Sequence, residues 1–138
     1  MLNIILMKVN EYISLLAAFL LFIFGAATVF MGGSVLFDLF DMRAKQGNYI
    51  PFVVLANWIC GFIYLLAAYG FIARKQWTKN LLLVALVLLI ATFLGFAYHI
   101  FSGGLYEMKT LGAMTFRTLL TLIMLIVAHL IIPVRKEL

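Results

Sequence analysis

Long stretches without a charged residue alternate with short charged segments, and this pattern predicts the helices of the chain. The uncharged stretches run from Glu11 to Asp38, from Lys45 to Arg74 and from Lys79 to Glu107, and a fourth, from Lys109 to Arg135, contains only Arg117. Each can cross a bilayer, because a spanning helix needs about 20 apolar residues. We therefore predict four helices, over about residues 12–30, 50–73, 81–101 and 111–133.

These four segments predict an all-α integral membrane protein. A segment in lipid must satisfy its own backbone hydrogen bonds, and the long apolar runs lack the alternation of barrel strands. The connections, of which 31–49 is the longest, are too short for a soluble domain. We expect one domain over residues 1–138, a four-pass bundle in up-down-up-down order. Lys8 precedes an apolar run too long for a signal peptide, so we expect the first helix to be retained.

The composition agrees with a membrane protein. Hydrophobic residues make up 67% of the chain and charged residues 11%, against about 25% charged in soluble domains. This balance excludes a soluble domain, a disordered chain, a coiled coil and a nucleic-acid binder. The single cysteine, Cys60, excludes an internal disulfide, a Cys-rich metal site and a thiol–disulfide enzyme.

Lys and Arg near the helix ends predict the orientation. One side of a four-pass chain would carry Lys8, Arg74, Lys75, Lys79, Arg135 and Lys136, and the other side Arg43, Lys45 and Lys109. This bias places both termini in the cytoplasm, and it accounts for the net charge of +5 without a nucleic-acid partner. We expect an integral protein of the bacterial inner membrane. In size and four-pass layout the chain resembles several small bacterial membrane families, including the DoxX-like group.

Arg117 is a charged residue inside a predicted helix, about two turns from its outer end. Such a side chain either snorkels to the outer headgroups or turns inward to hold an anionic group. The carboxylates available on the outer side are Asp38, Asp41 and Glu107. A guanidinium suits a carboxylate because its fork can make two hydrogen bonds to it.

Asn57 and His99 are the other polar candidates within the bilayer. Asn57 shares a helical face with Gly61, Tyr64 and Ala68, a pattern that favours a packing seam over a ligand site. His99 lies near the outer end of the third helix, where a lone histidine is more often a satisfied polar group than a ligand.

Six of these residues gather in the outer half of the predicted bundle and therefore define a candidate ligand-binding site: Asp38, Asp41, Asn57, His99, Glu107 and Arg117. We predict no cofactor. A divalent metal remains an alternative, because His99, Glu107, Asp38 and Asp41 are ligand types for zinc or manganese, although their spacing fits no motif. A haem held by His99 and His129 is disfavoured, because these two lie at opposite faces of the membrane.

The leading functional hypothesis is a non-enzymatic one, in which an outward-facing polar cleft binds or transports a small polar or anionic solute or an ion. Arg117 would hold the negative charge, Asn57 would orient the solute, and His99 would give pH sensitivity. Besides the lipid bilayer, the partners would be this solute and a second copy or a larger complex.

Two alternatives remain open. The chain is a structural accessory subunit if it packs on a larger membrane complex through Gly25-Ala26-Ala27 and through Gly61 with Ala68. It is a lipid- or quinone-linked enzyme if His99 serves as a base with a metal or Arg117 as the electrophile.

Overall fold

The computed structural model describes residues 1–132 and shows four long helices. These are α1 (Leu2–Leu36), α3 (Pro51–Ala73), α4 (Trp77–Phe101) and α5 (Met108–Ile131), with a 3-10 turn η1 (Leu39–Asp41) and a short helix α2 (Met42–Gln46) after α1. All four are long and apolar enough to cross a membrane. The predicted all-helical architecture, with four helices that could span a membrane, is therefore confirmed for the described residues.

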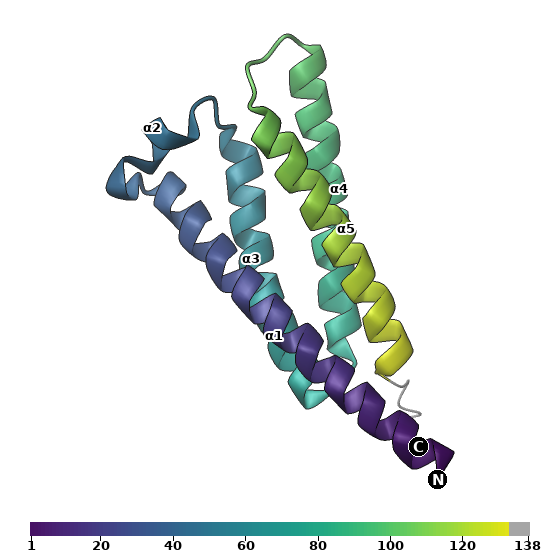
Figure 1. The fold of residues 1–138 in the computed structure, drawn as a ribbon. Helices are drawn as coiled ribbons and strands as arrows, with labels where there is room; N and C mark the ends of the chain where they lie inside the picture. The colour runs from purple at the N-terminus through teal and green to yellow at the C-terminus, as the bar shows by residue number, and fades with distance from the viewer. Residues whose placement is uncertain (133–138) are drawn as a thin grey trace.

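Consecutive long helices run in opposite directions (Figure 1). The connection from α1 to α3, which contains α2, lies at the same end of the bundle as the connection from α4 to α5. We call this end the α2 end. Helix α1 packs mainly on α3, α3 also packs on α4, and α4 packs on α5. Helices α1 and α5 make few contacts and spread apart toward the α2 end (Figure 1).

The helix limits differ from the predicted ones mainly in α1 and α4. Helix α1 spans Leu2–Leu36 instead of residues 12–30, and α4 begins at Trp77 instead of residue 81. No glycine or proline interrupts residues 2–12, so the helix continues through Lys8. Charges limit the part of a helix that lies in hydrocarbon, whereas helix breakers limit the helix itself. The predicted end of the last helix, at residue 133, lies outside the described residues.

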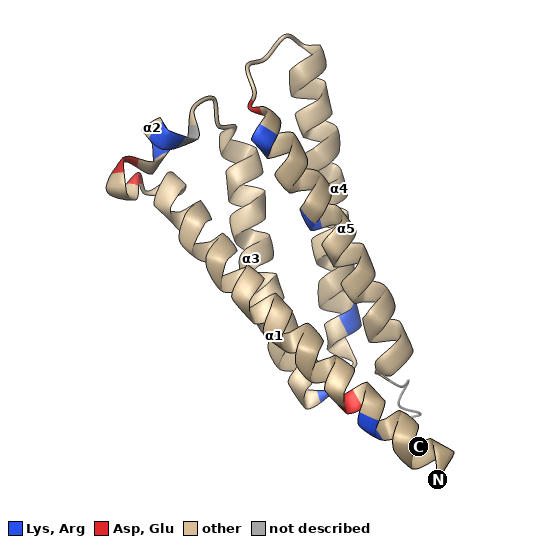
Figure 2. Cartoon of the chain, viewed as in Figure 1, with Lys and Arg blue, Asp and Glu red and all other residues tan. Residues whose placement is uncertain are grey.

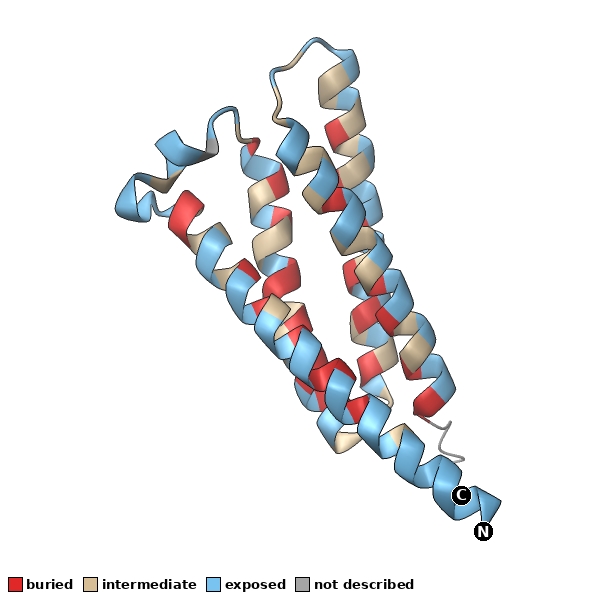
Figure 3. Cartoon of the chain, in the orientation of Figure 1, coloured by how far each residue is buried: buried red, intermediate tan, exposed pale blue. Residues whose placement is uncertain are grey.

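Most residues on the outward faces of the helices are exposed (Figure 3), and many of these exposed side chains are large and apolar. Exposed large side chains include Phe19, Leu94 and Leu130. A protein with such a surface would aggregate in water, whereas contact with lipid chains stabilises it. Buried residues form a stripe on the inward face of each helix (Figure 3). This inside–outside pattern supports an integral membrane protein.

Helices α1 and α3 approach each other at two glycines. A Cβ added to Gly25 would lie 3.0 Å from the carbonyl oxygen of Gly61, and one added to Gly61 would lie 2.8 Å from Cγ2 of Val29. Gly61, Tyr64 and Ala68 are buried in this contact, so the predicted packing seam is confirmed. The seam faces α1 of the same chain, which leaves only Ala26 and Ala27 of the predicted partner surface exposed.

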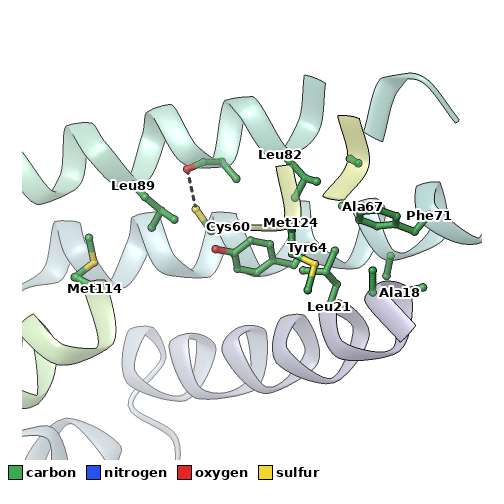
Figure 4. Close-up of a cluster of buried hydrophobic side chains, with 14 of the residues drawn as sticks. Ala18, Leu21, Cys60, Tyr64, Ala67, Phe71, Leu82, Leu89, Met114 and Met124 are labelled. Carbon is green, nitrogen blue, oxygen red and sulfur yellow. Dashed lines mark hydrogen bonds between the residues drawn. The ribbon is translucent and has the colours of Figure 1, made fainter. Parts of the chain in front are cut away.

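A short chain of hydrogen bonds links α3 to α5 in the interior. The Thr121 hydroxyl donates to the Arg117 carbonyl at 2.7 Å, so Tyr64 must donate its hydroxyl proton to Oγ1 of Thr121, at 2.6 Å. Figure 4 shows Tyr64 among buried side chains of the core, with the Cys60 thiol directed at the Ala85 carbonyl 3.9 Å away. The Tyr64–Thr121 bond therefore fixes the position of α5 along the axis of α3, and with it the depth of Arg117 in the bundle.

Replacing Tyr64 by phenylalanine should lower the free energy of unfolding by about 0.6 kcal/mol, and by no more than about 1.7 kcal/mol, the range for hydrogen bonds between membrane helices. The ring stays buried, and only the bond to Thr121 is lost. Reversible unfolding in mixed detergent micelles measures the change. Tyr98→Phe is the matched control, because Tyr98 is exposed. Equal losses in both variants would refute an interior role for the Tyr64 hydroxyl.

Candidate functional site

A cleft of about 290 Å³ lies between α1, α3 and α5 near the α2 end. Each of the three helices contributes one wall. The lining residues are Thr28, Met31, Gly32 and Val35 from α1, Val53, Val54 and Asn57 from α3, Tyr49 and Ile50 from the segment just before α3, and Lys109, Thr110, Ala113 and Arg117 from α5. The volume is at the lower limit of small-molecule sites, about 300–1,000 Å³, so the cleft suits a small ligand or one group of a larger one.

The cleft has a polar floor and a polar mouth. Thr28, Asn57 and Arg117 are the lining residues farthest from the α2 end on their helices, and they form the floor. Arg117 is nine residues into α5, or about 13 Å along its axis at about 1.5 Å per residue. Lys109 and Tyr49 lie at the mouth. A ligand at the floor therefore sits well inside the bundle.

The Arg117 side chain turns toward the interior of the bundle. Its Cζ lies 5.6 Å from the ring centroid of Phe24 in α1, one turn farther from the α2 end than Thr28. A guanidinium over an aromatic face at this distance gains a cation–π attraction. Arg117 therefore does not snorkel to the headgroups at the α2 end, which decides between the two orientations that the sequence left open.

The guanidinium of Arg117 has unused hydrogen-bonding capacity. Its Nε is buried and has no hydrogen-bond partner, and the described residues that line the cleft include no carboxylate. Asn57, on the facing wall, has a buried Oδ1 that also lacks a partner. Buried polar atoms usually make hydrogen bonds, so this donor and this acceptor are available to a polar group that enters the cleft.

His99 and Glu107 lie outside the cleft, in the connections at the α2 end. The Nε2–H of His99 donates to the Leu105 carbonyl at 2.9 Å, which closes the turn after α4. Oε1 of Glu107 accepts the backbone N–H of Asn48 at 3.0 Å. Both side chains thus hold connections together in this structure, and neither lines the cleft with Arg117.

Asp38 and Asp41 also lie outside the cleft, at the turn after α1. Asp38, Phe40 and Asp41 all have positive φ, so the segment does not form the regular helical turn that would align the two carboxylates. Oδ1 of Asp38 accepts the backbone N–H of Arg43 at 3.3 Å. The Arg43 side chain in turn donates to two carbonyls at the end of α1, where its charge complements the helix dipole.

The four metal candidates are dispersed over three segments. His99 ends α4, Glu107 precedes α5, and the two aspartates follow α1. Among residues 1–132, no three His, Cys, Asp or Glu side chains are grouped closely enough to hold a metal ion. The cofactor prediction stays a prediction.

Four polar lining residues escaped the sequence analysis: Thr28, Tyr49, Lys109 and Thr110. Lys109 was counted only as a charge that sets the orientation. It lies eight residues before Arg117, so helical spacing could have placed both near one face. Thr28 gave no signal, because a threonine in a long apolar helix usually bonds its own backbone.

Comparison with protein families, curated proteins and solved structures finds no match to this chain. The functional argument therefore depends on the chemistry of the cleft. Its strongest feature is the inward guanidinium of Arg117, which has no acidic partner among the lining residues.

Proposed function

We propose that this protein binds a small polar or anionic solute, or an ion, in the cleft between α1, α3 and α5. This binding is a step in the transport of the solute across the membrane. The observation that carries the proposal is the buried, unpartnered Nε of Arg117 opposite the unpartnered Oδ1 of Asn57. Arg117 holds the negative charge, Asn57 orients the solute, and Lys109 attracts anions to the mouth.

The energetics favour an anionic ligand. A guanidinium costs about 2.5–3.5 kcal/mol at the centre of a spanning helix on insertion scales, and somewhat less nearer the interface. The Phe24 ring offsets about 1–2 kcal/mol of such a cost. A bound anion supplies the remaining compensation, since hydrogen bonds to charged groups contribute about 1.5–3 kcal/mol.

The proposal places the α2 end on the outer side of a bacterial inner membrane, so that the cleft is outward-facing. Both ends of the bundle carry Lys and Arg (Figure 2). The end opposite α2 has Lys8, Arg74, Lys75 and Lys79 from the described residues, and the α2 end has Arg43, Lys45 and Lys109. Arg135 and Lys136, which follow α5 in the sequence, increase this excess. The positive-inside rule then puts the α2 end outside.

Direct binding of small anions to the full chain tests the proposal. Native mass spectrometry in mild detergent would compare acetate and inorganic phosphate with ethylammonium, a cation of similar size. We expect an anion to bind in preference to the cation. Inorganic phosphate keeps an O–H that can donate to Oδ1 of Asn57, so Asn57→Leu should weaken phosphate binding about tenfold or more, the fold-change for losing one hydrogen bond to a charged group.

Asn80→Leu is the control, because Asn80 is exposed at the far end of α4. Equal weakening in both variants, or preference for the cation, would contradict the proposal. A larger membrane protein that co-purifies with a ligand-free chain would instead favour the accessory-subunit role.

A further inference from the structure

We infer that the ligand of this cleft is an amphiphilic acid, with one anionic headgroup and an apolar chain, which reaches Arg117 from the lipid through the gap between α1 and α5. This inference rests on the proposed function and narrows its ligand class. It follows from four features of the cleft: its apolar middle, its bridged mouth, its open side and the depth of its charge.

The middle of the cleft is mostly apolar. Between the floor and the mouth, the walls consist of the apolar residues Met31, Gly32, Val35, Ile50, Val53, Val54 and Ala113, together with one polar residue, Thr110. A small hydrated anion gains nothing from these apolar side chains, whereas an apolar chain is stabilised by leaving water beside them. The cleft therefore matches a ligand that is charged at one end and apolar along the rest.

The mouth at the α2 end is bridged by hydrogen bonds. The backbone N–H of Asn48 donates to Oε1 of Glu107 at 3.0 Å, and Nζ of Lys109 donates to the Lys45 carbonyl at 3.4 Å. These bonds tie α2 and the segment that follows it to the beginning of α5. They narrow the route by which a water-soluble ion would reach the floor.

On the side of the cleft between α1 and α5, the described residues form no hydrogen bond from one helix to the other, and the ring contact of Phe24 with Phe116 lies at the floor. These two helices make few contacts with each other and diverge toward the α2 end (Figure 1). Met31 lines the cleft and is still 41% exposed, so the cleft wall continues onto the lipid-facing surface. A molecule dissolved in the bilayer can therefore reach the cleft without entering water.

The depth of Arg117 agrees with access from the bilayer. The residue lies about 13 Å along α5 from the beginning of the helix, which is within the hydrocarbon layer of a bilayer whose core is about 30 Å thick. An acid that moves its headgroup inward to Arg117 keeps its chain among lipid chains. Both parts of such a molecule are then in favourable surroundings.

The test uses the full chain in nanodiscs of phosphatidylcholine, with radiolabelled dodecanoate as the probe and empty nanodiscs as background. We expect saturable one-to-one binding that acetate and inorganic phosphate compete for at least a hundredfold less well. Dodecanol has the same chain without the charge, so it should also compete poorly. The acid could be an anionic lipid of the bilayer or a single-chain acid, and phosphatidylglycerol added to the disc distinguishes the two. If phosphatidylglycerol displaces dodecanoate, the inference holds and the ligand is a bilayer lipid. If it does not displace dodecanoate, the inference holds and the ligand is a single-chain acid.

Two tryptophan variants of α5 locate the bound chain. Ala113→Trp fills the apolar middle of the cleft and should weaken dodecanoate binding at least tenfold. Leu119→Trp places the same ring on the exposed face and should leave binding unchanged. Circular dichroism and size exclusion check that both variants fold, and Arg117→Gln gives an independent loss of binding without added volume.

The outcomes separate this inference from the proposed function. If acetate or phosphate binds through Arg117 and dodecanoate does not, the inference is wrong and the proposed function stands. Equal competition by dodecanol likewise overturns the inference, because the charge is then irrelevant. If no anion binds in any form, both fail.

Discussion

Replacing Arg117 by glutamine should reduce anion binding about 10- to 150-fold without weakening the folded protein. The fold-change corresponds to about 1.5–3 kcal/mol for hydrogen bonds to a charged group. The second expectation follows from the surroundings of Arg117: among the described residues, its Nε has no partner and no carboxylate lines its cleft. Removal of the charge therefore leaves no acid unpaired, and it relieves the cost of a guanidinium in hydrocarbon. Binding and stability should move in opposite directions.

Ligand titration and detergent unfolding of the same samples measure both quantities. Arg117→Lys keeps the charge but loses the planar fork, so its affinity should lie between those of the wild type and Arg117→Gln. Lys109→Gln is the control for charge alone, and because Lys109 is exposed it should change affinity by no more than about 1 kcal/mol. A structural arginine would behave differently, since Arg117→Gln would then destabilise the fold and leave binding intact.

The sequence predicts the fold well because charge is excluded from hydrocarbon. The four uncharged stretches correspond to α1, α3, α4 and α5, and Pro51 and Ala73 lie within one residue of the predicted limits of the second helix. The beginnings of α1 and α4 were misplaced because Glu11 and Lys79 were taken as helix limits. A charged side chain at the membrane surface remains compatible with helical backbone, so only the limits of the hydrocarbon layer were visible in the pattern.

For the candidate site, the sequence predicts only how deep each polar residue lies along its helix. Position along a helix follows from counting residues at about 1.5 Å each, and this places Arg117 and Asn57 at similar levels. Which residues share a cleft also depends on which helices are neighbours, and hydropathy carries no such information. His99 lies at the same end of the bundle as the cleft, but its side chain bonds to the Leu105 carbonyl in the turn after α4 and does not line the cleft. Lys109 lines the cleft because the first turn of α5 lies across the cleft from α3.

Replacing Gly61 by leucine should be the most destabilising single change in the bundle, with a loss of about 3 kcal/mol or more in the free energy of unfolding. Even a single Cβ at this position lies 2.8 Å from Cγ2 of Val29 and 3.1 Å from its backbone nitrogen. The Val29 side chain can rotate away, but its backbone cannot move without α1. A leucine therefore forces α1 and α3 apart, at the largest helix–helix contact in the described chain.

Gly112→Leu is the matched control, because a Cβ at Gly112 meets no atom within 4 Å and the residue is exposed on α5. The same substitution there should stabilise the helix by up to about 1 kcal/mol, since glycine is a poor helix former. Unfolding in mixed micelles compares the two variants, and similar changes in stability would refute the close α1–α3 crossing.

Gly61→Leu should also weaken anion binding, because the added Cβ lies 3.2 Å from Cγ2 of Thr28 at the floor of the cleft. The glycine crossing thereby connects stability to function, since the contact that joins α1 to α3 also sets the spacing of two cleft walls.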